Sequence, residues 1–187
     1  RAALLNQFRG WADVASNIMW RPNLGGLGWH VALPDVAPHQ VIRDMRFLAE
    51  NNCTGLFFDT IMEHWATHGP HLYMLGRMAW NPYADGEAIL EDYYRRGFGP
   101  AAEEIKAYWT LLEQKRNEML HAGSNRFDIP QYYTEKVLTK ADSLLAKAAE
   151  QVADGEQKYM DRVAFVRAGF AYTRRLTRAR ELMIQME

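Results

Sequence analysis

Cysteine is almost absent from this chain, since Cys53 is its single cysteine among 187 residues. One thiol cannot form an intrachain disulfide, and it cannot supply a zinc site built on several cysteine ligands. Long hydrophobic runs are also absent, because no apolar stretch approaches the roughly 20 residues that a membrane helix needs. We therefore expect no membrane partner, while the compartment is not fixed by these absences.

The chain also lacks an excess of either charge, with 22 Lys and Arg residues against 23 Asp and Glu residues and a formal net charge of −1. This balance gives no electrostatic reason to expect nucleic acid as a partner. The glycines between residues 25 and 28 lack the Lys-Ser or Lys-Thr of a phosphate loop. The final segment is locally basic, but interspersed acidic residues favour a solvated helix face. Its arginines are Arg162, Arg167, Arg174, Arg175, Arg178 and Arg180.

Apolar residues are plentiful and periodic. Hydrophobic residues make up 48% of the chain and charged residues 24%, which excludes a disordered chain. Short apolar runs at 16–20 and 54–58 flank a stretch with helical spacing at 39–51, which predicts a strand–helix–strand unit of a parallel sheet. The later segments carry helical period over about 70–81, 85–98, 101–121, 131–152 and 156–186.

These patterns predict an α+β chain that is mostly α, with strands, loops and a helix in residues 1–69 and a helical subdomain in residues 70–187. Pro70 stands where the first residue of a helix would, and Asp85 is expected to cap the next helix. In the helix over 101–121, the period places Tyr108 and Trp109 inward and Glu113 outward.

A carboxylate directly follows the second apolar run. Asp59 would lie at the carboxyl end of a buried strand, where α/β barrels place their catalytic groups. Partial burial there would raise its pKa and suit it to general acid–base catalysis, with Glu63 as the second candidate carboxylate. Capping of the next helix or turn is an equally good interpretation of Asp59.

Aromatic and polar residues gather near both predicted strand ends. Sugar hydroxyls need charged or amide partners, and the apolar face of a pyranose packs on Trp. We therefore predict substrate-binding residues here. At the end of the first strand the alternative is Trp side chains that fill core space and an arginine in a structural ion pair. After the second strand the alternative is a solvated loop with capping roles. The residues are Trp20, Arg21, Trp29, His30, His64 and Trp65.

His64 and His68 have the i, i+4 spacing of two metal ligands on one helical face. The sequence places no third ligand, so we expect neither a metal nor a cofactor, and a metal hydrolase is the weakest of the functions considered.

Three segments of the chain resemble a known family. They are GLFFD from Gly55, HWATHGPHLYMLGRMAWNPYAD from His64 and DYYRRGFGPAAEEIKAYWTLLE from Asp92. They resemble a bacterial domain of unknown function, number 4838, found with glycoside-hydrolase-like barrels that are similar to alpha-glucuronidases. No catalytic residue is carried over from that family.

The resemblance implies that this chain is the C-terminal part of a larger protein. The first 60 residues would then supply the last strand–helix units of a (β/α)8-type barrel, with a C-terminal helical subdomain packed on it. It also implies a carbohydrate ligand, the remainder of the parent chain as a partner, and a secreted or periplasmic location.

Two classes of function follow from this reading. In the first, the parent protein binds or hydrolyses a carbohydrate, and since two strands cannot close a barrel, any hydrolysis belongs to the full-length parent. In the second, the chain is a non-catalytic helical module that packs on a catalytic domain. That alternative predicts partly exposed apolar faces at Tyr93, Tyr94, Tyr108 and Trp109.

Overall fold

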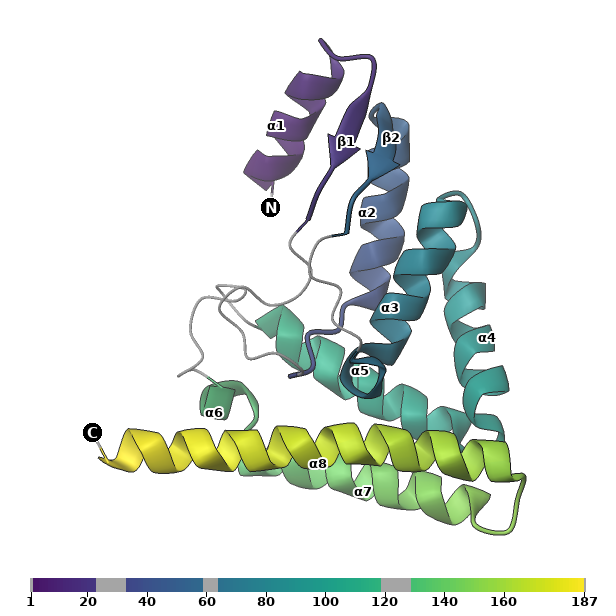
Figure 1. Ribbon diagram of the computed structural model, residues 1–187, viewed down its shortest axis with the longest axis vertical. Coiled ribbons are helices and arrows are strands. Elements are labelled where there is room, and N and C mark those ends of the chain that lie inside the picture. The colour runs from purple at the N-terminus through teal and green to yellow at the C-terminus, as the bar shows by residue number, and fades with distance from the viewer. Residues whose placement is uncertain (1, 23–32, 59–63, 119–128, 187) are drawn as a thin grey trace.

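The computed structural model describes residues 2–22, 33–58, 64–118 and 129–186, and it confirms the mostly helical α+β class (Figure 1). The elements in chain order are α1 (Ala2–Ala12), β1 (Ile18–Trp20), α2 (Pro38–Glu50), β2 (Cys53–Leu56), α3 (Trp65–Trp80), α4 (Gly86–Phe98), a 3₁₀ turn (Gly99–Ala101), α5 (Ala102–Glu118), α6 (Ile129–Tyr132), α7 (Glu135–Val152) and α8 (Gln157–Met186). The described helices include no segment long and apolar enough to span a membrane.

The first third of the chain forms the predicted strand–helix–strand unit. β1 and β2 lie parallel, with Met19 opposite Gly55 and Trp20 opposite Leu56, and α2 connects them. Asn52 turns the chain from α2 into β2 at φ 58°, a left-handed conformation that asparagine tolerates. In the described part of the chain the sheet consists of these two strands, so the further strands of a barrel stay a prediction.

The helix that we expected to begin at Pro70 begins earlier, at Trp65, and Pro70 lies inside it. That prediction was wrong because a proline in a helix removes only one donor, here the one that would serve the carbonyl of Ala66. At this point α8 packs closely on α3, with Gly169 facing the same carbonyl. The expected division between residues 69 and 70 stays a prediction, although α3 runs continuously across it.

The start and the end of α4 follow the sequence signals. Asp85 accepts a hydrogen bond from the backbone N–H of Ala88 at 3.0 Å, which confirms it as the N-cap. Gly99 ends the helix at φ 53°, where a side chain would be strained and would also collide with the ring of Tyr159.

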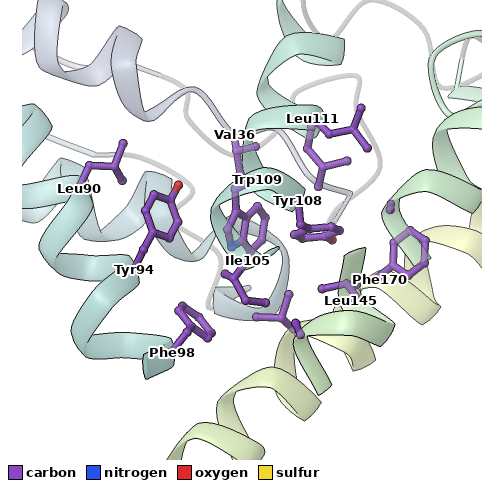
Figure 2. Packing of buried hydrophobic residues seen from close by; sticks show 14 of the residues in the cluster. Val36, Leu90, Tyr94, Phe98, Ile105, Tyr108, Trp109, Leu111, Leu145 and Phe170 are labelled. Atoms are coloured by element: carbon purple, nitrogen blue, oxygen red, sulfur yellow. The ribbon is translucent and has the colours of Figure 1, made fainter. Parts of the chain in front are cut away.

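The hydrophobic core is organised around α5, as Figure 2 shows. Tyr108 and Trp109 are 0% and 1% exposed, and their ring centroids lie 4.8 Å apart in an edge-to-face contact. Side chains from α4 lie on one side of them and side chains from α7 and α8 on the other. These flanking residues include Leu90, Tyr94, Phe98, Leu145 and Phe170.

The expectation that four aromatic residues keep partly exposed faces is therefore wrong for most of them. Tyr94, Tyr108 and Trp109 are buried by the chain's own helices, and Tyr93 is half-buried against the ring of Tyr73. The helical part of the chain thus closes its own core.

The last two helices pair as the predicted hairpin and cross the ends of α3 and α4 (Figure 1). The first turn predicted for α7 is a separate short helix, α6, because the chain breaks at Tyr133 and Thr134. The break lets the buried Tyr133 hydroxyl donate to the carbonyl of Pro34 at 2.8 Å. That bond ties the hairpin to the segment before α2.

Candidate functional site

Four of the predicted site residues lie outside the described residues. They are Asp59 and Glu63, the predicted catalytic carboxylates, and Trp29 and His30, predicted to bind substrate. Their roles stay predictions.

Trp20 and Arg21 lie at the carboxyl end of β1, as predicted. Trp20 is half-buried and lines a hollow of about 180 Å³ between α1 and α2, together with Phe8 and Phe47. Arg21 is exposed, and its guanidinium carbon lies 5.7 Å from the ring centroid of Phe57, just after β2. The two strand ends therefore meet, with a cation–π contact between them.

His64 directly precedes α3 and makes no side-chain capping hydrogen bond, and its ring centroid lies 6.4 Å from that of His68. Its Nε2 is buried and has no hydrogen-bond partner among the described residues. Burial lowers the pKa of His68, whose Nδ1 lies 3.0 Å from the Thr67 hydroxyl. Within the described ranges no group of three or more His, Cys, Asp or Glu residues is placed to hold a metal.

Trp65 lines a different feature, a groove of about 380 Å³ between α3, α4 and α8 that we call the aromatic groove. Its lining residues are Trp65, Gly69, Tyr73, Asp92, Tyr93, Arg96, Gly97, Phe98, Arg162, Phe165 and Val166. The structure therefore places Trp65 in one hollow and Trp20 in another.

Aromatic side chains form the apolar surfaces of the groove. Trp65 and Phe165 keep 48% and 53% of their surface exposed, although both are large and apolar. Tyr73 and Tyr93 pack together, with ring centroids 5.0 Å apart and planes inclined by 35°. The groove thus offers aromatic surface to a ligand without any rearrangement of the core.

Two glycines lie at close contacts around the groove. A Cβ atom at Gly69 would lie 2.6 Å from the hydroxyl of Tyr93. A Cβ atom at Gly169 would lie 2.6 Å from the carbonyl oxygen of Ala66 on α3. The carbonyl of Ala66 belongs to the backbone and cannot move aside, so a larger residue at Gly169 would push α8 away from α3, whereas the Tyr93 hydroxyl is the end of a side chain that can shift.

Charged groups stand at the α4 side of the groove. Arg96 Nε donates to Asp92 Oδ1 at 2.8 Å, and this hydrogen bond is the main cause that holds the pKa of Asp92 below its usual value. Arg162 Nη1 donates to the backbone carbonyls of Arg96 and Gly97 at 3.2 and 3.0 Å. The groove therefore combines aromatic faces with fixed hydrogen-bonding groups.

Most of this groove does not follow from the sequence patterns. The basic stretch predicts a solvated face for Arg162, and that residue is indeed exposed. Phe165 carried the one usable signal, because it lies on the polar side of α8 between the buried positions Val163 and Val166. Nothing in a single sequence indicates that α4 and α8 meet there.

A second polar cluster holds the segment before α2. Glu113, expected to point outward, is 7% exposed, and that prediction was wrong. Its Oε2 lies 2.5 Å from His39 Nδ1, and its Oε1 accepts the backbone N–H of His39 at 3.2 Å. Arg116, one turn along α5, donates to Asp35 at 3.0 Å and to Gln40 at 2.9 Å. The carboxylate is buried because a partner 74 residues away satisfies it.

The pKa values of two histidines in this region are shifted from the ordinary value in opposite directions. The side-chain hydrogen bond with Glu113 raises the pKa of His39. Burial lowers the pKa of His71 to about 4, and its neutral Nδ1 accepts the backbone N–H of Ala37 at 3.2 Å. Both histidines therefore hold the backbone at the start of α2, where they bond to or include residues 37 and 39, and this is a positioning role.

Comparison with known proteins identifies one family. The model of the family described as Domain of unknown function (DUF4838) matches residues 2–110 of the chain. No curated protein and no solved structure matches it.

Proposed function

This chain belongs to the family described as Domain of unknown function (DUF4838), and we propose that it is the C-terminal portion of a glycoside-hydrolase-like protein that binds a carbohydrate. The aromatic groove is the proposed binding site. The observation that carries this proposal is the pair of half-exposed aromatic side chains, Trp65 and Phe165, beside charged hydrogen-bonding groups in one groove.

The chemistry of a sugar ring suits this arrangement. The C–H face of a pyranose packs on an aromatic ring, while its hydroxyls exchange hydrogen bonds with charged side chains at the ring edge. Trp65 and Phe165 supply the aromatic surface, and Asp92 and Arg96 supply an acceptor and donors. An aromatic surface that faces solvent in a well-packed protein also points to a ligand.

We assign binding, and not hydrolysis, to the groove. Glycoside hydrolysis needs two carboxyl groups about 5 to 9.5 Å apart, and Asp92 is the one carboxylate among the described residues that line the groove.

Hydrolysis by the full-length parent remains our proposal for Asp59 and Glu63. An Asp59→Asn variant of that parent is expected to lose glycan hydrolysis, and unchanged hydrolysis of every glycan tested would remove Asp59 from the mechanism.

Sugar binding is tested by substituting, in separate variants, two tryptophans of the same helix. Trp65 lines the groove at the start of α3, whereas Trp80 ends the helix, is 92% exposed and does not line the groove. Trp65→Ala is expected to weaken oligosaccharide binding about tenfold, because a stacked aromatic face is lost. Trp80→Ala removes the same side chain elsewhere and should leave the affinity unchanged.

The measurement is a glycan-array screen of the chain, followed by isothermal titration of the best oligosaccharide with both variants. Circular dichroism of each variant verifies that the fold is kept. If the chain binds no glycan, or if both variants bind equally well, the groove is not a sugar site.

A second candidate function is favoured by the other end of the molecule. Large apolar side chains are exposed on β1, on and just after α1, and just after β2, and each strand has one edge without a partner among the described residues. They are Leu4, Trp11, Val14, Met19 and Phe57. A two-stranded sheet is marginal alone, so we propose that this face packs on the remainder of a larger parent chain.

Hydrogen exchange tests this proposal. The full-length parent is expected to show protection of β1 and β2 that the isolated chain lacks, and equal exchange in both proteins would contradict the proposed packing.

A further inference from the structure

We infer that the saccharide bound in the aromatic groove is acidic, with a carboxylate or sulfate group that Arg96 and Arg162 recognise. This inference rests on the proposed function and names the class of sugar. It is carried by the charge at the α4 side of the groove.

The lining of the groove is cationic. Its fully charged side chains are Arg96, Arg162 and Asp92, so two guanidiniums stand against one carboxylate. That carboxylate is also shared, because Arg95 on the outer side of α4 pairs with it too. An acidic sugar would form charge-assisted hydrogen bonds between its anionic group and these guanidiniums, which a neutral sugar cannot form.

Arg162 is held in a way that keeps its charge available. Its Nη1 donates to two backbone carbonyls at the end of α4, which are neutral acceptors. No carboxylate among the described residues pairs with it. An arginine has five N–H donors in a planar fork, so donors remain for a ligand oxyanion while the side chain is already oriented. Binding then costs little side-chain entropy.

The aromatic walls distinguish an acidic saccharide from a simple anion. Inorganic phosphate or sulfate would meet the guanidiniums but would leave the exposed faces of Trp65 and Phe165 uncovered. A ring that carries its anionic group on one edge can satisfy both parts of the groove at once. A carboxylate and a sulfate ester share the oxyanion geometry that guanidinium recognises.

The test compares three hexasaccharides by isothermal titration: one of galacturonate, one derived from heparin, and neutral cellohexaose. We expect at least one acidic hexasaccharide to bind tenfold more tightly than the neutral one at low salt, and this preference to shrink as sodium chloride is added. Binding of the galacturonate hexasaccharide assigns a carboxylate, whereas binding of the heparin hexasaccharide alone, which carries sulfate groups beside its carboxylates, assigns a sulfate.

Two pairs of variants locate the recognition. Arg96→Gln and Arg162→Gln should each weaken binding of the acidic hexasaccharide about tenfold more than binding of the neutral one. Arg167→Gln and Arg175→Gln remove the same charge from α8 outside the groove, so both should bind like the unchanged chain. The ratio of acidic to neutral affinity is the readout, because a loss of folded protein would lower both affinities alike.

The outcomes separate this inference from the proposed function. Equal binding of acidic and neutral sugars would overturn the inference and leave the sugar site in place. Failure of all three sugars and of the wider glycan screen would overturn both. Tighter binding of a single-stranded oligodeoxythymidine than of any sugar would also overturn both, and would assign the groove to nucleic acid.

Discussion

A single carboxylate illustrates how a partner distant in sequence decides the environment of a residue. Glu113 lies on a helix face that the periodic pattern assigns to solvent, yet it is buried because His39 lies 2.5 Å away. The pairing gives the segment before α2 a fixed position. It also couples the stability of the protein to pH.

We predict that these histidines give the free energy of unfolding a maximum near pH 6.5. Folded His71 has a pKa of about 4, below its ordinary 6.5, so between these values the unfolded chain binds more protons and stability rises with pH. The pKa of His39 is raised above 6.5 by Glu113, so its stabilising contribution is complete below pH 6.5 and is lost as pH rises through the folded value.

Urea unfolding at several pH values between 4 and 8.5 measures the rise of the unfolding free energy below pH 6.5, the acid limb, and its fall above that pH, the alkaline limb. His71→Asn keeps an acceptor for the Ala37 N–H, and it should remove the acid limb, which is worth about 3 kcal/mol at pH 4. His39→Gln should flatten the alkaline limb. Glu87 and Arg43 also face His39 with opposite effects, the arginine lowering its pKa. An unchanged pH profile in both variants would contradict this account.

At the scale of elements, the groove depends on how closely α8 approaches α3. The carbonyl of Ala66 lacks a helical donor because Pro70 has no N–H, and Gly169 is the residue that faces it. The contact brings Phe165 and Arg162 of α8 to the side of Trp65. A glycine in the middle of a long helix is thus explained by packing.

We predict that Gly169→Ala destabilises the protein by about 1 to 3 kcal/mol and weakens ligand binding in the groove, because the added methyl forces α8 away from α3. Gly76→Ala is the matched control, since it also lies in a helix but a Cβ there meets nothing within 4 Å. It should be neutral or stabilising by up to about 1 kcal/mol. Thermal unfolding of both variants measures the difference, and equal melting temperatures would show that the α3–α8 contact tolerates a methyl group.

At the scale of the molecule, buried side chains are distributed very unequally between the helices. The aromatic core around α5 joins α4, α7 and α8 (Figure 2). In contrast, α1 has no buried residue and contacts α2 mainly through Phe8 and Phe47, whose ring centroids are 5.7 Å apart (Figure 1). Since local stability follows buried apolar contact, the two ends of the molecule should open with different free energies.

We predict that amide hydrogens of α1 exchange at least 100-fold faster than those of α5 in the isolated chain, after correction for intrinsic rates. Native-state hydrogen exchange followed by NMR or mass spectrometry gives both values. Comparable protection of α1 and α5 would mean that α1 belongs to the same cooperative unit as the core.

The sequence by itself determined the local structure of this protein. Hydrophobic period, the Asp85 cap and the glycine at residue 99 are short-range signals, and they located most helices and the parallel strand–helix–strand unit. The prediction that a helix begins at Pro70 was wrong, because α3 begins at Trp65 and carries the proline inside it, where α8 packs on it.

Only the tertiary structure decided which side chains share a site. Trp65, Arg96 and Arg162 come from three helices, of which α3 and α8 approach closely because Gly169 has no side chain, and Glu113 is buried because of a distant histidine. Such pairings depend on the distances and angles between helices, and the spacing of residues along one chain does not contain these.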